Sequence, residues 1–76
     1  MKIFTSYVSP TFKIGSRIRA VDERGNEAFV PYIRDVEREN NFEGAACHLL
    51  RKKGFEFYWV KKIGESKRGM TFEAHI

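Results

Sequence analysis

Residues 39–54 limit the fold of this chain most, because they alone have the spacing of an amphipathic helix. The apolar side chains in this stretch recur at intervals of three and four residues, at Phe42, Ala45, Ala46, Leu49 and Leu50. Such intervals place them on one stripe of a helix, which has to pack against another layer. Since the chain offers one helix, that layer has to come from strands.

The other segments alternate apolar and polar side chains, as half-buried strands do. The predicted strands cover residues 2–8, 16–21, 27–32, 55–63 and 70–76. Their order relative to the helix is β-β-β-α-β-β. We therefore expect an α+β fold, in which an antiparallel sheet of about five strands carries one helix packed on one face.

The sequence defines the end of the predicted helix better than its start. Gly54 suits the left-handed position that follows a helix, so the end is well defined. The start falls within residues 35–41, and two alternatives remain. Asp35 caps an early start, or Asn40 and Glu43 form a capping box at a later one.

Two connections are also predicted from their turn residues. Residues 22–26 form a hairpin loop in which Gly25 and Asn26 are expected to supply the positive φ angles. Residues 9–15 connect the first two strands and contain Phe12 and Ile14. We expect both of these apolar side chains to tuck under the sheet.

Length and cysteine content indicate one small domain, residues 1–76. A chain of 76 residues is near the size at which a single core only just offsets chain entropy. The one cysteine, Cys47, excludes an intrachain disulfide, and no apolar run approaches the roughly 20 residues of a membrane span. No leading segment resembles a secretion signal. We expect a cytoplasmic protein.

The charge balance favours an anionic partner. The formal net charge is +4 and the sequence pI is about 9.5. Clustered Lys and Arg side chains bind phosphates and release counterions, so nucleic acid is one candidate partner. The alternative is that the charge serves only solubility.

One helix covers one face of the sheet, so the second face is either solvated or used. We assign Phe55, Phe57 and Trp59 to the helix side. The expected residues of the second face mix aromatic and basic types: Lys2, Phe4, Arg17, Arg19, Tyr58, Val60, Lys62, Thr71, Glu73 and His75. Base stacking and phosphate contact need these types, so the predicted nucleic-acid-binding residues on this face are Arg17, Arg19, Tyr58 and Lys62. An Arg-rich outer face that keeps the sheet soluble is the plain alternative.

A second basic cluster is predicted where the helix end meets the last hairpin loop. Its members are Arg51, Lys52, Lys53, Lys61, Lys62, Lys67 and Arg68. Assembled, they would contact a phosphate backbone. Otherwise the first three complement the helix dipole and the rest are solvated loop charges.

The chain contains no catalytic or metal-binding motif. Cys47 and His48 are adjacent on the predicted helix, so their side chains point about 100° apart and do not form a nucleophile–base pair. With His75 they are too few and wrongly spaced for a zinc site. No phosphate-binding glycine loop is present. We expect a protein that is not an enzyme and has no metal or cofactor.

Residues 53–60 partly match the RNP1 motif of RNA-recognition domains. Glu56 stands where that motif has a small residue, and Val60 stands where it has an aromatic one. The predicted strand order also differs from the RNA-recognition order βαββαβ. We therefore interpret Gly54 as a helix cap.

Three motifs follow one another along the chain. They are Tyr-Val-Ser-Pro-Thr at residues 7–11, Gly-Ser-Arg-Ile-Arg-Ala at 15–20, and an Ala-rich helix that ends in Gly54-Phe55. In this order they resemble a family of short uncharacterised proteins from phages and bacterial mobile elements, over most of the chain. The resemblance implies an accessory protein in a bacterial host cytoplasm and transfers no activity.

Three functions are compatible with these residues. The first is nucleic-acid binding through the basic and aromatic sheet face, with DNA and RNA not distinguished. The second is a protein-binding inhibitor or modulator of a host system, of the anti-restriction or anti-CRISPR type. The third is a homodimer formed by pairing of edge strands.

Overall fold

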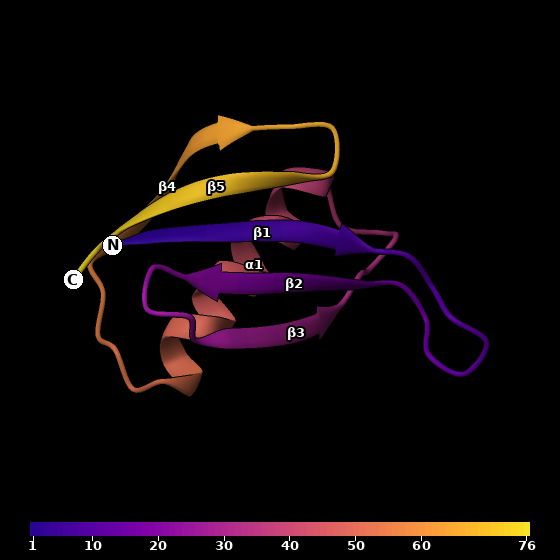
Figure 1. The fold of residues 1–76 in the computed structure, drawn as a ribbon. Helices are drawn as coiled ribbons and strands as arrows, with labels where there is room; N and C mark the ends of the chain where they lie inside the picture. The colour runs from indigo at the N-terminus through magenta and orange to yellow at the C-terminus, as the bar shows by residue number, and fades with distance from the viewer.

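Five strands and one helix form in the order that the alternation and helical spacing predict (Figure 1). The computed structural model describes residues 1–76, and its elements are β1 (Lys2–Val8), β2 (Arg17–Asp22), β3 (Glu27–Pro31), α1 (Arg38–Lys52), β4 (Trp59–Glu65) and β5 (Gly69–His75). The strands make one open sheet in the order β3-β2-β1-β5-β4, with every neighbouring pair antiparallel. The predicted α+β fold is confirmed.

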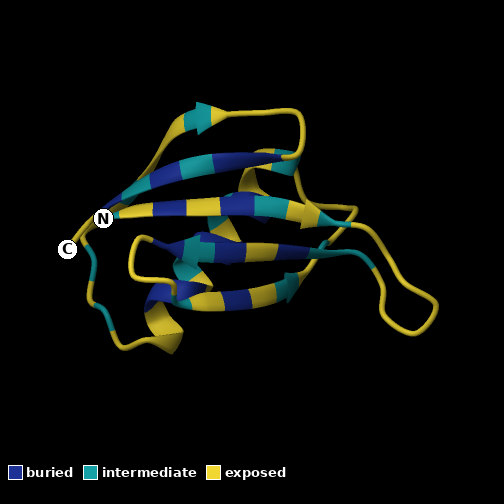
Figure 2. Cartoon of the chain, in the orientation of Figure 1, coloured by how far each residue is buried: buried dark blue, intermediate teal, exposed yellow.

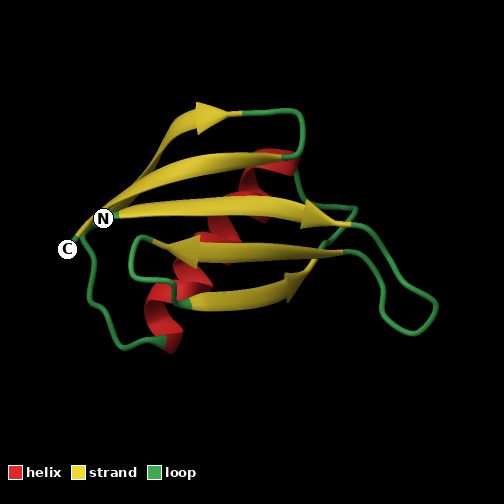
Figure 3. Ribbon diagram, in the orientation of Figure 1, coloured by secondary structure: helices red, strands yellow, loops and turns green.

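The central strand, β1, sets the two faces of the sheet. Ile3 and Thr5 are buried, and Phe4 between them points the other way. Thr5 lies opposite Ala20 of β2 and Met70 of β5, and its hydroxyl donates a 2.7 Å hydrogen bond to the Met70 carbonyl. α1 crosses the sheet on this side only (Figure 3).

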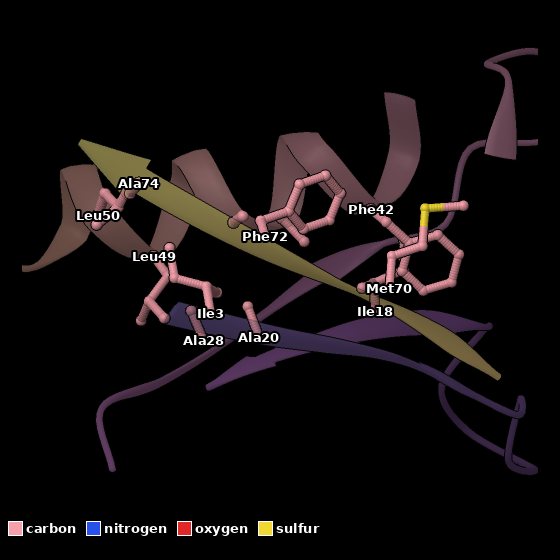
Figure 4. Close-up of a cluster of buried hydrophobic side chains, with 12 residues drawn as sticks. Ile3, Ile18, Ala20, Ala28, Phe42, Leu49, Leu50, Met70, Phe72 and Ala74 are labelled. Carbon is pink, nitrogen blue, oxygen red and sulfur yellow. The ribbon is translucent and has the colours of Figure 1, made fainter. Parts of the chain in front are cut away.

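The core forms between this sheet face and the apolar stripe of α1 (Figure 4). All five predicted stripe residues are buried: Phe42, Ala45, Ala46, Leu49 and Leu50. Their sheet partners include Ile3, Ile18 and Phe72, which have no exposed surface. Alanines on both layers, among them Ala20 and Ala28 on the sheet, leave space for the two backbones to approach closely.

The end of α1 is the glycine-capped turn that the sequence predicts. The Phe55 amide donates to the Leu50 carbonyl at 2.9 Å, and the Gly54 amide donates to the Arg51 carbonyl at 3.0 Å. This pair of bonds is the Schellman motif. Gly54 has φ 77°, which an L side chain rarely adopts.

The start of α1 lies at Arg38, inside the predicted interval, but neither predicted cap forms. Glu37 occupies the N-cap position without a side-chain cap bond. The buried Asn41 side chain instead holds the lead-in loop. It accepts from the Ile33 amide and donates to the Ile33 and Val36 carbonyls, all at 2.9 Å. Hydrogen bonds between the Asn41 side chain and the lead-in loop thus take the place of a side-chain cap at the start of α1.

The fourth strand begins later than predicted and has the opposite phase. Phe55 and Phe57 pack against the core from an irregular link, and β4 starts at Trp59. Val60 pairs with Ala74 on the helix side, so the assignment of Trp59 to the core is wrong. The alternation changes phase between the link and the strand.

The β1–β2 connection projects from the end of the sheet, and its residues are exposed (Figure 2). The Thr11 amide donates to the Ile14 carbonyl at 2.7 Å, and the Ile14 amide donates to the Thr11 hydroxyl at 3.1 Å. Phe12 lies at the tip of this closed turn and is fully exposed. The expectation that Phe12 and Ile14 tuck under the sheet is wrong, because the turn holds them away from it.

The β2–β3 loop is organised by the buried Asp22 carboxylate. Its Oδ1 accepts from the Arg24 and Asn26 amides at 2.9 Å, and its Oδ2 accepts from the Asn26 side chain at 2.8 Å. Gly25 has the predicted positive φ, 85°, whereas Asn26 does not have one. Burial raises the pKa of Asp22, but the hydrogen bonds from Asn26 and Arg24 outweigh burial, so the net pKa is lowered.

An Asp22→Asn variant is expected to have a flatter dependence of stability on pH. A carboxyl whose pKa is lower in the folded state stabilises the fold above its unfolded pKa, and this contribution is lost as pH falls through the folded pKa. Wild type should therefore lose stability below about pH 4 more steeply than the variant. Urea denaturation from pH 7 to pH 2 measures this slope. The exposed Asp35→Asn is the control, and parallel profiles for wild type and Asp22→Asn would contradict the assignment.

Candidate nucleic-acid interface

The sheet face opposite α1 is not covered by any other element (Figure 3). We call it the open face. From strand register its residues are Lys2, Phe4, Ser6, Val8, Arg17, Arg19, Val21, Glu27, Phe29, Pro31, Trp59, Lys61, Thr71, Glu73 and His75.

Three aromatic side chains of the open face remain about half exposed. The exposed fractions are 49% for Phe4, 43% for Phe29 and 46% for Trp59. They belong to β1, β3 and β4, so they follow a diagonal from one sheet edge to the other. Large apolar side chains gathered on one uncovered face are typical of a binding surface.

Arg17 is the arginine of this face that forms no ion pair, although it is less exposed than Arg19. Its Cζ lies 5.1 Å from the centroid of the Phe29 ring, in a cation–π arrangement. No carboxylate lies within ion-pair distance, and its Nε is buried without a hydrogen-bond partner. Arg19, in contrast, donates to the Glu27 carboxylate, which compensates part of its charge.

The open face carries more positive than negative charge. Its four cations are Lys2, Arg17, Arg19 and Lys61, and its two carboxylates are Glu27 and Glu73. The formal excess is therefore +2 with His75 neutral. A face that combines exposed rings with excess positive charge is suited to stacking on bases and to pairing with phosphates.

Three predicted residues of this face lie elsewhere, and one of them is Val60, which pairs with Ala74 on the helix side. Tyr58 precedes β4, is 84% exposed, and places its ring 5.5 Å from the His75 ring, so it borders the face. Lys62 points to the helix side, where its Nζ lies 2.8 Å from Glu39 Oε1 and 3.0 Å from Glu65 Oε1. Hydrogen bonds to Glu39 and Glu65 raise the pKa of Lys62, and the bond to Glu39 has the larger effect. Its assignment to the second face is wrong.

Sequence reasoning missed Phe29, Trp59 and Lys61 as open-face residues. The alternation of Phe29 with Ala28 and Val30 is a local signal that could have placed it there. The alternation of residues 59–63, in contrast, fits either phase. The pairing of Val60 with Ala74 decides the phase, and this is a contact between strands that the segment itself does not specify.

The predicted basic cluster does not assemble. Arg38, in the first turn of α1, donates to the Ser66 and Lys67 carbonyls at 3.3 and 3.2 Å. The last hairpin loop therefore meets the start of the helix, and residues 51–53 lie at its other end (Figure 1). A 15-residue helix separates the two groups by about 22 Å. Lys67 and Arg68 thus belong to a different surface from Arg51, Lys52 and Lys53.

Arg51 at the end of α1 and Arg24 of the β2–β3 loop both pack on the aromatic link that contains Phe55 and Phe57. Arg51 lies 5.7 Å from the ring centroid of Phe57, and Arg24 lies 5.7 Å from that of Phe55. Cations in the last turn also complement the helix dipole. This structural role accounts for Arg51, while Lys52 and Lys53 are exposed and form no ion pair.

The Cys and His side chains are distributed over both layers of the fold. Cys47 is partly buried in α1, where burial raises the pKa of its thiol and so lowers its thiolate fraction. His48 is exposed, and His75 stacks under Trp59 on the open face, with the ring centroids 5.3 Å apart. No three His, Cys, Asp or Glu side chains converge as metal ligands would. α1 is not long and apolar enough to cross a membrane.

No family model, curated protein or solved structure matches this chain. The resemblance to short phage proteins, carried by residues 7–11 and 15–20, stays a prediction.

Proposed function

We propose that this chain is a non-enzymatic module that binds single-stranded nucleic acid on the open face. The observation that carries the proposal is the set of three half-exposed rings, Phe4, Phe29 and Trp59, on one uncovered face beside the unpaired Arg17. Every base has a flat π-face that stacks on such rings, and a guanidinium pairs with the phosphate between two bases.

The geometry favours a single strand over a duplex. In a duplex the faces of the bases are already stacked on one another, whereas a single strand exposes them to protein rings. Phe29 and Trp59 are four strand spacings apart across the sheet, about 19 Å, and six residues apart along the strand direction. A path between them contacts several successive nucleotides. The proposed setting, an accessory protein of a phage or mobile element in a bacterial cytoplasm, follows the resemblance of residues 15–20.

An Arg17→Ala variant is expected to bind single strands with a weaker salt dependence. Removing one phosphate contact lowers the slope of log K against log salt by about one. Fluorescence anisotropy with labelled single-stranded DNA, single-stranded RNA and duplex DNA at several salt concentrations measures this slope. Arg34→Ala removes an exposed cation outside the open face and should leave the slope unchanged.

Two results would contradict this proposal. One is the absence of single-strand binding at low salt. The other is an equal loss in Arg17→Ala and Arg34→Ala, which would mean that net charge alone determines binding.

A protein partner is the second candidate, and the projecting β1–β2 loop favours it. Phe12 is fully exposed on a hydrogen-bonded turn, and aromatic side chains presented in this way often anchor protein interfaces. A host protein that cross-links to wild type but not to Phe12→Ala would support an inhibitor function. Edge pairing into a homodimer is opposed by Pro31 at the end of β3 and by the register shift between Lys62 and Gly64 in β4.

A further inference from the structure

A pocket of about 350 Å³ opens at the end of the molecule where the β4–β5 loop meets the first turn of α1. We call it the hairpin-end pocket. Its lining residues are Tyr7, Tyr32, Arg38, Phe42, Lys67 and Arg68. Tyr7 lies on the helix side of the sheet, opposite Ile18, so this pocket is separate from the open face.

The two tyrosines form one wall of the pocket. Their rings pack edge to face, with the centroids 5.5 Å apart and the planes at 89°. Neither hydroxyl has a hydrogen-bond partner within the protein. The wall therefore offers aromatic surface together with two free hydroxyl groups, which donate or accept hydrogen bonds.

Arg38 joins the pocket to the hairpin loop, and its own charge is already compensated. Its guanidinium lies over the Phe42 ring, 5.0 Å from the centroid, and donates to the Glu65 carboxylate at 3.3 Å. It also donates to the carbonyls of Ser66 and Lys67. These contacts hold the backbone of the hairpin loop in place, so Arg38 is a positioning residue.

Lys67 and Arg68 supply the uncompensated charge. Neither forms an ion pair, and the Arg68 carbonyl accepts from the Tyr7 amide at 2.8 Å, which ties the loop to β1. The nearby Glu65 is already neutralised by Arg38 and Lys62, and the hydrogen bond from Lys62 lowers the pKa of Glu65. Two free cations thus stand on a loop that is held from both sides.

We propose that the hairpin-end pocket binds a nucleotide, with its phosphate against Lys67 and Arg68 and its base against the two tyrosines. Neighbouring Lys and Arg side chains suit the oxygens of a phosphate, and aromatic rings suit a planar base. The volume lies near the lower end of the range for small-ligand sites, which fits one nucleotide unit. The site stands on its own contacts and does not depend on the function proposed for the open face. Its ligand is either a free nucleotide or the phosphorylated end of a strand.

The test is an NMR titration of the intact ¹⁵N-labelled protein with AMP, adenosine and inorganic phosphate. AMP is expected to cause saturable shifts at the amides of Tyr7, Tyr32 and residues 67–68. Adenosine and phosphate should each bind at least about tenfold more weakly, because each makes half of the contacts. The double variant Lys67→Gln/Arg68→Gln should lose about tenfold or more of the AMP affinity.

Matched controls distinguish AMP binding at this pocket from attraction of AMP by the positive charge of the whole protein. Lys52→Gln/Lys53→Gln removes the same charge at the other end of α1 and should keep AMP affinity within about twofold. Arg17→Ala should also keep it, so failure of the open-face proposal would leave this result intact. Shifts that do not saturate, that map away from the pocket, or that weaken equally in both double variants would overturn the proposal.

A second comparison identifies the source of the phosphate. An oligonucleotide with a 5′-phosphate that shifts the Tyr7 and Tyr32 amides at lower concentration than its 5′-hydroxyl counterpart supports capture of a strand end. Equal behaviour of the two oligonucleotides, with AMP still saturating, supports a free nucleotide.

Discussion

A Gly69→Ala variant is expected to lose about 3 kcal/mol of folding free energy, a large part of the stability of a domain of this size. Gly69 is buried at the start of β5, paired with Ser6 of the central strand. A Cβ at this position would overlap the Thr5 carbonyl oxygen and lie 2.9 Å from the Thr5 carbonyl carbon and 3.0 Å from the Ser6 Cα. Only backbone atoms of β1 could move to relieve the overlap, so the β1–β5 pairing has to distort.

Thermal denaturation followed by circular dichroism measures this loss as a fall in Tm of at least about 10 °C. The matched control is Gly64→Ala in the same hairpin, where the added Cβ would lie 3.6 Å from the Thr71 Cβ, an ordinary contact. Its Tm should stay within a few degrees of wild type. Equal Tm values for the two variants would contradict the packing described for β1 and β5.

Removing the three open-face rings is expected to remove most of the affinity for single strands. Each base stacked on an aromatic side chain contributes about 1–3 kcal/mol, so Phe4→Ala, Phe29→Ala and Trp59→Ala should each weaken binding about tenfold. Combined, they should lower affinity by at least about 100-fold. Anisotropy titration with single-stranded DNA at low salt measures each variant.

Phe12→Ala is the matched control for these variants. It removes an aromatic side chain that is exposed on the projecting loop and should keep the affinity of wild type. Circular dichroism confirms that each variant is folded. A folded triple variant that binds as tightly as wild type would exclude stacking on the open face.

The fold follows from patterns that are local in the chain. The helical stripe from Phe42 to Leu50 is the only one present, and one stripe requires one sheet face to cover it. In β2 the buried Ile18 and Ala20 set the phase of the alternation, so Arg17 and Arg19 are correctly predicted on the opposite side. For that strand, knowledge of the other strands is not needed.

The errors arise where a contact between distant segments determines which face a side chain joins or where an element begins. Phe55 and Phe57 are apolar at strand spacing yet pack on the core from a link, which reversed the predicted phase of Trp59 and Lys62. The start of α1 depends on the hydrogen bonds of Asn41 to the lead-in loop, and no capping pattern describes them.

The hairpin-end pocket shows the same dependence on long-range contacts. Its lining comes from the ends of β1 and β3, the start of α1 and the last loop. Lys67 and Arg68 were predicted beside residues 51–53 because the direction of α1 across the sheet is not encoded in a local pattern. The bonds from Arg38 to that loop show that it meets the first turn of α1 and not the last one.

The most direct test of the open-face proposal uses the only tryptophan of the chain, Trp59. Its ring stacks on His75 on one side and is 46% exposed, so a base that stacks on it should quench its emission. Titration with an unlabelled single-stranded oligonucleotide is predicted to give saturable quenching that added salt reverses. If anisotropy shows binding while Trp59 emission stays constant, the strand lies elsewhere on the protein and the proposal is wrong.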